Sequence, residues 1–249
     1  MIVCRSAAEI GRMRAANQLV AFVLVQLAAA VAEGVTTADL DALAERLVRE
    51  AGAEPAFKGY RGYPATLCAS VNSEVVHGIP SEMIKLREGD VISVDVGAII
   101  DGYYGDNAYT FPVGKISGEA TRLLSATKAS LEAGIVQTRE GNHLFDIGAA
   151  VQSVAEKAGF SVVREYVGHG IGRNMHEDPN VPNYGTPGKG PRLEVGMVLA
   201  IEPMVNAGEA AVDSLPDGWT VVTRDGMLSA HFEHTVAITA DGPVVLTVD

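Results

Sequence analysis

Apolar residues recur at helical spacing through the first thirty residues of the chain. The repeating positions are Ile10, Met13, Val20, Leu24, Leu27 and Val31. Ser6 to Glu9 has the form of a capping box, so this pattern predicts a helix with one buried face that ends near Gly34. A second helix is predicted from Thr37 to Ala51, with Thr36 as its N-cap and Gly52 just past its end.

The apolar period then shortens to that of strands. The predicted strands are Leu67–Ile79, Asp90–Ile100 and Tyr103–Val113. The last two face each other across Asp101-Gly102, a dipeptide typical of hairpin turns. Helices are predicted again at Gly118–Ala133 and His143–Ala158, and strands return from Val162 to the end of the chain. Two helices followed by strands therefore occur twice.

A short segment of the first half also recurs in the second half. Leu86–Asp95 and Leu193–Glu202 align without a gap at an offset of 107 residues, and both end in a carboxylate after an apolar run. We therefore predict an α+β fold with two similar halves of paired helices and antiparallel strands, at about 6–115 and 116–249. No low-complexity linker separates the halves, so residues 1–249 are predicted to form a single domain.

Charge and cysteine content narrow the class of function. The chain has 249 residues, with 19 Lys and Arg against 31 Asp and Glu, and its net charge of −12 opposes binding to a phosphate backbone. A nucleic-acid partner is therefore not expected. Cys4 and Cys68 form no dense disulfide framework, which favours a reducing compartment, the cytoplasm.

One apolar stretch resembles a targeting segment. Leu19–Ala32 follows Arg12 and Arg14 in the manner of a signal peptide. Gln26 interrupts this stretch, and it is shorter than the roughly 20 residues that a bilayer span needs. We expect a buried helix and no membrane association.

Two carboxylates flank the predicted hairpin turn. In an antiparallel hairpin centred on Asp101-Gly102, Asp95 and Asp106 are near-opposite residues on the same face. Like charges across a ladder are destabilising unless a positive group lies between them, so the pair indicates a bound cation. Taken alone, Asp106 is equally compatible with a solvated loop residue.

The second half supplies further metal-binding side chains. His169 lies in Gly168-His169-Gly170, Glu202 follows the apolar strand Val198–Ile201, and Glu233 lies in His231-Phe232-Glu233-His234. Acidic residues are rarely buried without a partner, although a surface position at the strand end is the alternative for Glu202.

Together with Asp95 and Asp106 these residues provide one imidazole and four carboxylates. Four carboxylates carry two more charges than one divalent ion neutralises, whereas two ions balance them. The oxygen-rich set favours Mn²⁺, Fe²⁺ or Co²⁺ and metal-assisted hydrolysis.

Two more histidines precede turn-forming residues. His77 stands before Gly78-Ile79-Pro80, and His176 before Glu177-Asp178-Pro179. An imidazole at these positions can donate a hydrogen bond to a carbonyl or an oxyanion. His143 and His231 are assigned to the solvent-facing class.

These motifs have the order and spacing of a known family. The quoted segments are Tyr60-Arg61-Gly62-Tyr63-Pro64, Cys68-Ala69-Ser70-Val71-Asn72, Val76-His77-Gly78-Ile79-Pro80, Gly168-His169-Gly170-Ile171-Gly172, Ile201-Glu202-Pro203, Asp217-Gly218-Trp219-Thr220 and Phe232-Glu233-His234-Thr235. With Asp95 and Asp106, they resemble the bacterial type I methionine aminopeptidases, which are M24-type metallopeptidases. The resemblance runs essentially end to end and implies the pita-bread fold with its internal pseudo-two-fold.

The resemblance also assigns roles to individual residues. It makes Asp95, Asp106, His169, Glu202 and Glu233 the ligands of two divalent ions, with Asp106 and Glu233 bridging. It implies that a metal-activated hydroxide attacks the methionine carbonyl, that Glu202 relays a proton, and that His77 and His176 hold the substrate. The methionine pocket would be lined by Tyr60, Tyr63, Cys68, Met175 and Trp219. A peripheral site for a monovalent cation would be formed by Asn72 and Ser229.

The implied activity is removal of the initiator methionine from nascent polypeptides, at the ribosome, when the second residue is small. The chain is expected to act as a monomer. Met175 stands where many members have Phe, and Gly97 where Thr is common, so the pocket shape differs while the reaction is kept. The alternatives are a prolidase-like peptidase that acts on Xaa-Pro substrates and a non-catalytic binding module of the same fold.

Overall fold

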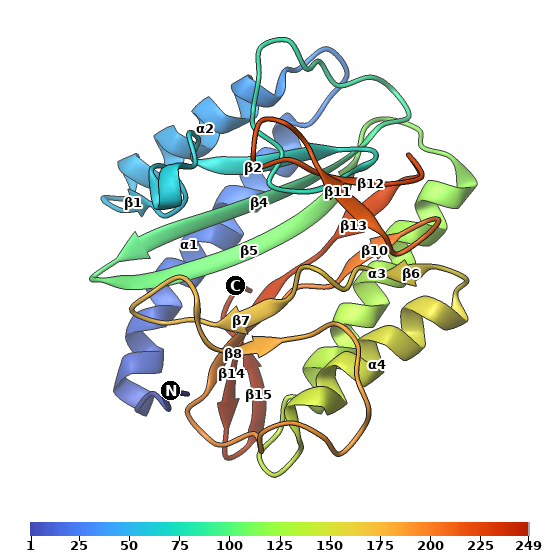
Figure 1. The fold of residues 1–249 in the computed structure, drawn as a ribbon. Coiled ribbons are helices and arrows are strands. Elements are labelled where there is room, and N and C mark those ends of the chain that lie inside the picture. The colour runs from blue at the N-terminus through green and yellow to red at the C-terminus, as the bar shows by residue number, and fades with distance from the viewer. Residues whose placement is uncertain (249) are drawn as a thin grey trace.

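The computed structural model describes residues 1–248, and its helices occur as two pairs. The helices are α1 (Ala7–Ala30), α2 (Thr37–Glu50), α3 (Gly118–Gln137) and α4 (Leu144–Lys157), with a 3-10 turn η1 (Tyr60–Gly62). In Figure 1 the blue helices α1 and α2 lie behind one sheet, and the green helix α3 and the yellow-green helix α4 lie on another side of the molecule. Residue 249, which ends the second predicted half, lies outside the described residues.

The strands pair in an antiparallel manner throughout. They are β1 (Glu54–Pro55), β2 (Leu67–Val71), β3 (Glu74–Val76), β4 (Val91–Ile100), β5 (Tyr103–Pro112), β6 (Ser161–Val162), β7 (Gly168–Gly170), β8 (Glu177–Val181), β9 (Val198–Ile201), β10 (Met204–Asn206), β11 (Val212–Ser214), β12 (Val221–Thr223), β13 (Ser229–His231), β14 (His234–Thr239) and β15 (Gly242–Val245). In the first sheet β4 pairs with β5 on one side and with β1 and β2 on the other. The other sheets have the orders β13-β10-β6, β11-β12-β3 and β15-β14-β9-β7-β8. The predicted α+β class with antiparallel strands is confirmed.

Helix α1 begins as predicted and ends earlier than predicted. Ser6 caps it, since the Glu9 amide donates to the Ser6 hydroxyl and the Glu9 carboxylate accepts from the Ser6 amide. The helix stops at Ala30 because the backbone of Val31 is extended. Beyond the helix, the Gly34 amide donates to the Leu86 carbonyl at 2.8 Å. By length and composition alone α1 could cross a membrane, but its buried side chains pack on β4 and β5.

Helix α3 continues beyond its predicted end at Ala133. The next residue, Gly134, lies inside the helix at the crossing with α4, where a Cβ would come within 2.9 Å of Val151 Cγ2. The glycine therefore serves close packing of the two helices, and α3 ends at Gln137 instead.

The predicted strand Leu67–Ile79 is two strands. Asn72 adopts a left-handed conformation with φ of 56° between β2 and β3. Its side chain donates to Asp90 and accepts from the Val91 amide, at 2.8 and 3.0 Å. These bonds fix the turn, and β3 joins a different sheet, beside β12.

Two apolar cores flank the hairpin β4–β5. One lies between α1, α2 and the first sheet, and the other lies between α3, α4 and the strands β9, β10 and β14. The Tyr109 side chain in β5 packs against both cores. Strands from the two parts of the chain thereby meet at β5, where the candidate site lies.

Candidate metal centre

The hairpin β4–β5 carries the first two carboxylates on one face. Asp106 pairs with Gly97, and Asp95 pairs with Ala108, so the two aspartates are diagonal neighbours two positions out of direct register. Their predicted placement on one face is confirmed. Asp106 is buried, with its side chain 6% exposed.

The second part of the chain brings a histidine and two glutamates to the same face. His169 lies in β7, opposite Ala200 of β9; Glu202 follows β9, and Glu233 lies between β13 and β14. The Glu233 amide donates to the Ala108 carbonyl at 2.9 Å, which fixes it against β5. The His169 Nε2 atom lies 3.8 Å from Asp106 Oδ2 and 3.5 Å from Glu202 Oε1.

The His169 ring is oriented for metal binding. Its Nδ1 lies 2.9 Å from the Gly170 carbonyl oxygen, which can only accept, so Nδ1 carries the proton. The other nitrogen, Nε2, is then an unprotonated donor atom that faces Asp106 and Glu202. Burial lowers the pKa of His169 to about 3, which keeps the ring neutral.

The carboxylates lack a cationic partner. Burial, followed by the neighbouring carboxylates, raises the pKa of Asp106 and Glu233, and burial raises the pKa of Asp95 to about 7. Asp95 Oδ1, Asp106 Oδ1 and Glu233 Oε1 are buried atoms without a hydrogen-bond partner. Within residues 1–248, no lysine or arginine forms an ion pair with these side chains.

A metal ion therefore fits this group of side chains. One donor atom from each of Asp106, His169 and Glu233 lies within 4.8 Å of the others. Oxygen-rich donors with one imidazole suit divalent ions of the Mn²⁺, Fe²⁺ and Co²⁺ type. A bound cation would also satisfy the orphaned carboxylate oxygens, which otherwise cost free energy in the folded state.

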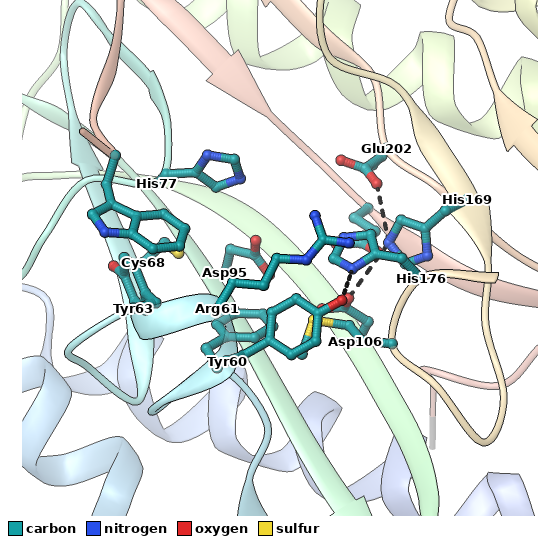
Figure 2. Close-up of a pocket in the computed structure, with 14 residues that line it drawn as sticks. Tyr60, Arg61, Tyr63, Cys68, His77, Asp95, Asp106, His169, His176 and Glu202 are labelled. Atoms are coloured by element: carbon teal, nitrogen blue, oxygen red, sulfur yellow. Dashed lines mark hydrogen bonds and ion pairs between the residues drawn. The ribbon is translucent and has the colours of Figure 1, made fainter. Parts of the chain in front are cut away.

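His176 lies at the edge of these ligands. Its Nδ1 is 2.8 Å from the Tyr60 hydroxyl, and its ring packs on Tyr60 and on His169 with centroid distances of 5.4 and 4.3 Å (Figure 2). Burial, followed by the charge of Arg61, lowers the pKa of His176. The ring is therefore a neutral hydrogen-bonding group.

His77 approaches from the opposite side of the pocket. It has a φ of 60° and contacts the rings of Tyr166 and Trp219 edge-on, at 5.5 and 6.4 Å. Burial, followed by the charge of His176, lowers the pKa of His77 to about 4. Both histidines can donate a hydrogen bond as neutral imidazoles.

All the side chains predicted for catalysis, metal binding and the methionine pocket line one cavity of about 160 Å³ (Figure 2). The lining residues are Phe57, Tyr60, Arg61, Tyr63, Cys68, His77, Asp95, Asp106, His169, Met175, His176, Glu202, Trp219 and Glu233. Tyr63, Cys68 and Met175 are buried and form its apolar end. Gly97 packs behind this wall, because a Cβ there would come within 2.6 Å of the Phe57 ring.

His231 was predicted to face solvent, and that prediction is wrong. The side chain is 1% exposed, and its Nε2 lies 3.7 Å from Glu202 Oε2. Its position two residues before Glu233, in a stretch of strand character, was the available signal, since alternate residues share a face. His143 lies at the N-terminus of α4, outside the pocket.

Sequence reasoning also missed Phe57 and gave Arg61 no role of its own, yet both line the pocket. Asn72 and Ser229 lie together, since the Ser229 amide donates to the Asn72 carbonyl at 2.9 Å. The monovalent-cation site assigned to them stays a prediction.

The site and fold together are those of a known class of hydrolase. Residues 11–240 match Peptidase_M24, so the chain belongs to metallopeptidase family M24. Within that family it is 51% identical to methionine aminopeptidase 1 of Bacillus subtilis and 54% identical to the methionine aminopeptidase of Clostridium acetobutylicum, with 99% of both chains covered in each case.

Solved structures agree with this relationship. The methionine aminopeptidases of Rickettsia prowazekii and Thermotoga maritima superpose with TM-scores of 0.98, at 42% and 45% identity and with complete coverage of both chains. The pita-bread fold is thereby confirmed. A prolidase of Pyrococcus horikoshii shares the fold at 22% identity and a TM-score of 0.80, and the chain covers 64% of it.

Proposed function

We propose that this chain removes the N-terminal methionine from polypeptides by metal-dependent hydrolysis. One observation carries the proposal: the acidic ligand group, two neutral histidines and an apolar slot all line the same cavity. The carboxylates and metals account for hydrolysis, and the slot accounts for the choice of side chain. The relatives described above carry the name of this activity.

Five side chains would hold the metals. They are Asp95, Asp106, His169, Glu202 and Glu233. Asp106 and Glu233 are the proposed bridging ligands, and two ions of the Mn²⁺, Fe²⁺ or Co²⁺ type balance the four carboxylates. When bound, the ions supply an acidified water and a Lewis acid for the scissile carbonyl.

The chain's own residues position the substrate and move the proton. His176 and His77 donate hydrogen bonds to the scissile carbonyl, and the bond from His176 strengthens as negative charge develops on that oxygen. Glu202 accepts a proton from the attacking water and passes it to the departing amine. Its main chain is fixed for this role, because the side-chain amide Nδ2 of Asn183 donates to the Glu202 carbonyl at 3.0 Å.

The apolar end of the pocket would take the methionine side chain. Tyr63 turns its hydroxyl away from the pocket and donates to the Leu67 and Gly78 carbonyls at 3.0 and 2.9 Å, so its ring faces Trp219 and the slot. Tyr60, Cys68 and Met175 complete the wall. A flexible thioether fits such a slot, and a small second residue fits the crowded space beside the two histidines.

We extend the proposal to the whole chain. The proposed ligands come from both predicted halves, about 6–115 and 116–249, which supports a single catalytic domain. We propose that this domain acts as a monomer on nascent polypeptides at the ribosome. Both cysteines are free thiols, which supports a cytoplasmic location.

The test is hydrolysis of Met-Ala-Ser by chelated protein that is refilled stepwise with Mn²⁺, Fe²⁺ or Co²⁺. We expect turnover only with metal. Asp106→Asn and Glu233→Gln should each abolish turnover and lower metal content, because a bridging carboxylate is lost. The matched control is Asp101→Asn, at the exposed turn of the same hairpin, which should keep wild-type turnover and metal content.

Other outcomes separate the alternatives. Cleavage of an Xaa-Pro dipeptide without cleavage of Met-Ala-Ser would identify a prolidase-like enzyme. A protein that binds no divalent metal would be a non-catalytic binding module. Full activity and metal loading in Asp106→Asn would refute the ligand assignment itself.

A further inference from the structure

A basic side chain projects from the turn η1 at the open side of the pocket. Arg61 adopts a left-handed conformation, with φ of 51° and ψ of 19°, between Gly59 and Gly62, which also have positive φ. A non-glycine residue is uncommon in this conformation and marks a candidate functional position. The turn places Tyr60 and Arg61 together in the pocket lining.

The guanidinium is free to meet a ligand. It lies over the Tyr60 ring, 5.3 Å from the centroid, and in Figure 2 it points toward His176. Within residues 1–248 it forms no ion pair and no side-chain hydrogen bond, whereas Arg5, Arg49 and Arg224 each pair with a carboxylate. Apart from the histidines, Arg61 is the one basic side chain among the described residues that line the pocket.

The direction of the substrate relates Arg61 to a particular peptide position. Under the proposed function, on which this inference rests, the methionine occupies the deep end, and the rest of the peptide leaves through the open side. The second residue is small, so the third is the first whose side chain can extend to a guanidinium at the pocket mouth. Each further residue adds only about 3.3–3.6 Å of chain, which keeps the third residue near the opening.

We propose that Arg61 selects peptides with an acidic side chain at the third position. The guanidinium pairs with a carboxylate there in partly solvated surroundings and repels a cation. The expected preference is therefore modest: about two- to five-fold in kcat/KM for glutamate over glutamine at low salt, and less as salt screens the pair.

The experiment compares three C-terminally amidated peptides, Met-Ala-Glu-Ser, Met-Ala-Gln-Ser and Met-Ala-Lys-Ser, with the metal-loaded enzyme. The amide removes a competing terminal carboxylate. We expect kcat/KM to fall in the order Glu, Gln, Lys. Arg61→Gln should equalise the three peptides, Arg61→Glu should reverse the order, and Arg61→Lys should keep it.

Lys58→Gln is the matched control. Lys58 lies on the same loop but pairs with Glu45 at 2.7 Å and is absent from the pocket lining, so the order should persist. The readout is a ratio within each variant, and a loss of folding or metal therefore scales all three peptides alike.

Equal kcat/KM for the three peptides in the wild-type enzyme at low salt overturns the inference. An unchanged order in Arg61→Gln overturns it as well. If metal-loaded protein cleaves no methionine peptide, both the proposed function and this inference are refuted. That result differs from cleavage without discrimination, which leaves the proposed function intact.

Discussion

His176 shows how single side chains are fixed at this site. The Tyr60 hydroxyl bonds its Nδ1, and the neighbouring rings hold its plane, so Nε2 is directed away from Tyr60. A neutral ring in this position contributes most when charge develops on an oxygen in front of it.

We predict that His176→Ala lowers kcat about 10²–10³-fold, the usual scale for the loss of one oxyanion donor. Steady-state kinetics on Met-Ala-Ser measure the change. Tyr60→Phe removes only the hydroxyl that orients the ring and should cost about ten-fold or less. A rise in KM with kcat unchanged would contradict the role given to His176.

At this scale the sequence predicted the side chains that gather in the pocket better than their neighbours. Asp106 and His169 stand beside glycines, and Glu202 directly follows an apolar strand, where a polar residue is conspicuous. His231 gave only the weaker signal of its alternation with Glu233. It faces Glu202 only because it pairs with Met204, two residues after Glu202, and that register joins segments far apart in the sequence.

At the scale of elements, the loop that carries Met175 and His176 is tied to the segment before α1. Glu177 Oε1 accepts from the Arg173 and Asn174 amides at 2.9 and 3.1 Å, and Oε2 pairs with the Arg5 guanidinium. The Arg5 and Glu177 side chains are only 7% and 12% exposed. The Arg5 amide in turn donates to Gly196 at 2.7 Å, just before β9.

Arg5→Met should therefore destabilise the protein by about 3 kcal/mol, since the Glu177 carboxylate remains largely buried without its cation. The same change should lower kcat through displacement of His176. Urea unfolding measures the change in stability, and steady-state kinetics measure the change in kcat. The control is Arg224→Met, which breaks an exposed ion pair with Asp213 and should leave both stability and kcat unchanged. If Arg5→Met lowers kcat by displacing His176, the double variant with His176→Ala should lose little more kcat than His176→Ala alone. Wild-type stability and kcat in Arg5→Met would contradict this account.

Element boundaries were predictable where local chemistry sets them. Capping boxes fixed the starts of α1 and α2, at Ser6 and Thr36. The turn at Asn72 escaped prediction because its side chain bonds Asp90 and Val91, which precede or begin another strand. Gly134 misled the prediction of the end of α3, because the glycine accommodates α4 and does not end its own helix.

At the scale of the whole molecule, the candidate metal centre lies where the two cores meet. Asp95 and Asp106 come from the hairpin, whereas His169 lies in β7, and Glu202 and Glu233 lie at strand ends, all beyond α4. The Thr235 hydroxyl donates to the Asp106 carbonyl at 2.9 Å, and this bond links β14 to β5. Duplication in the sequence predicted two related parts, but their meeting at β5 depends on contacts such as this one, between residues 129 positions apart.

This arrangement predicts that pH changes the stability of the metal-free protein more than that of the metal-loaded protein. Without metal, the carboxylates have pKa values above their usual range, about 7 for Asp95, against about 4 in the unfolded chain. The folded state then binds more protons at these carboxylates, so their contribution to stability is fully present below about pH 4 and is lost as pH rises toward 7 and beyond.

Each extra proton bound by the folded state changes the unfolding free energy by about 1.4 kcal/mol per pH unit. Bound divalent ions remove this loss because they pair with the ionised carboxylates. The increase in melting temperature on metal loading should therefore be larger at pH 7.5 than at pH 5.5, as measured by calorimetry. Asp95→Asn, which deletes one of the titrating groups, should flatten the pH dependence of the chelated protein. An increase that is independent of pH in the wild-type protein would show that the carboxylates are ionised without metal, and that the buried oxygens have another partner.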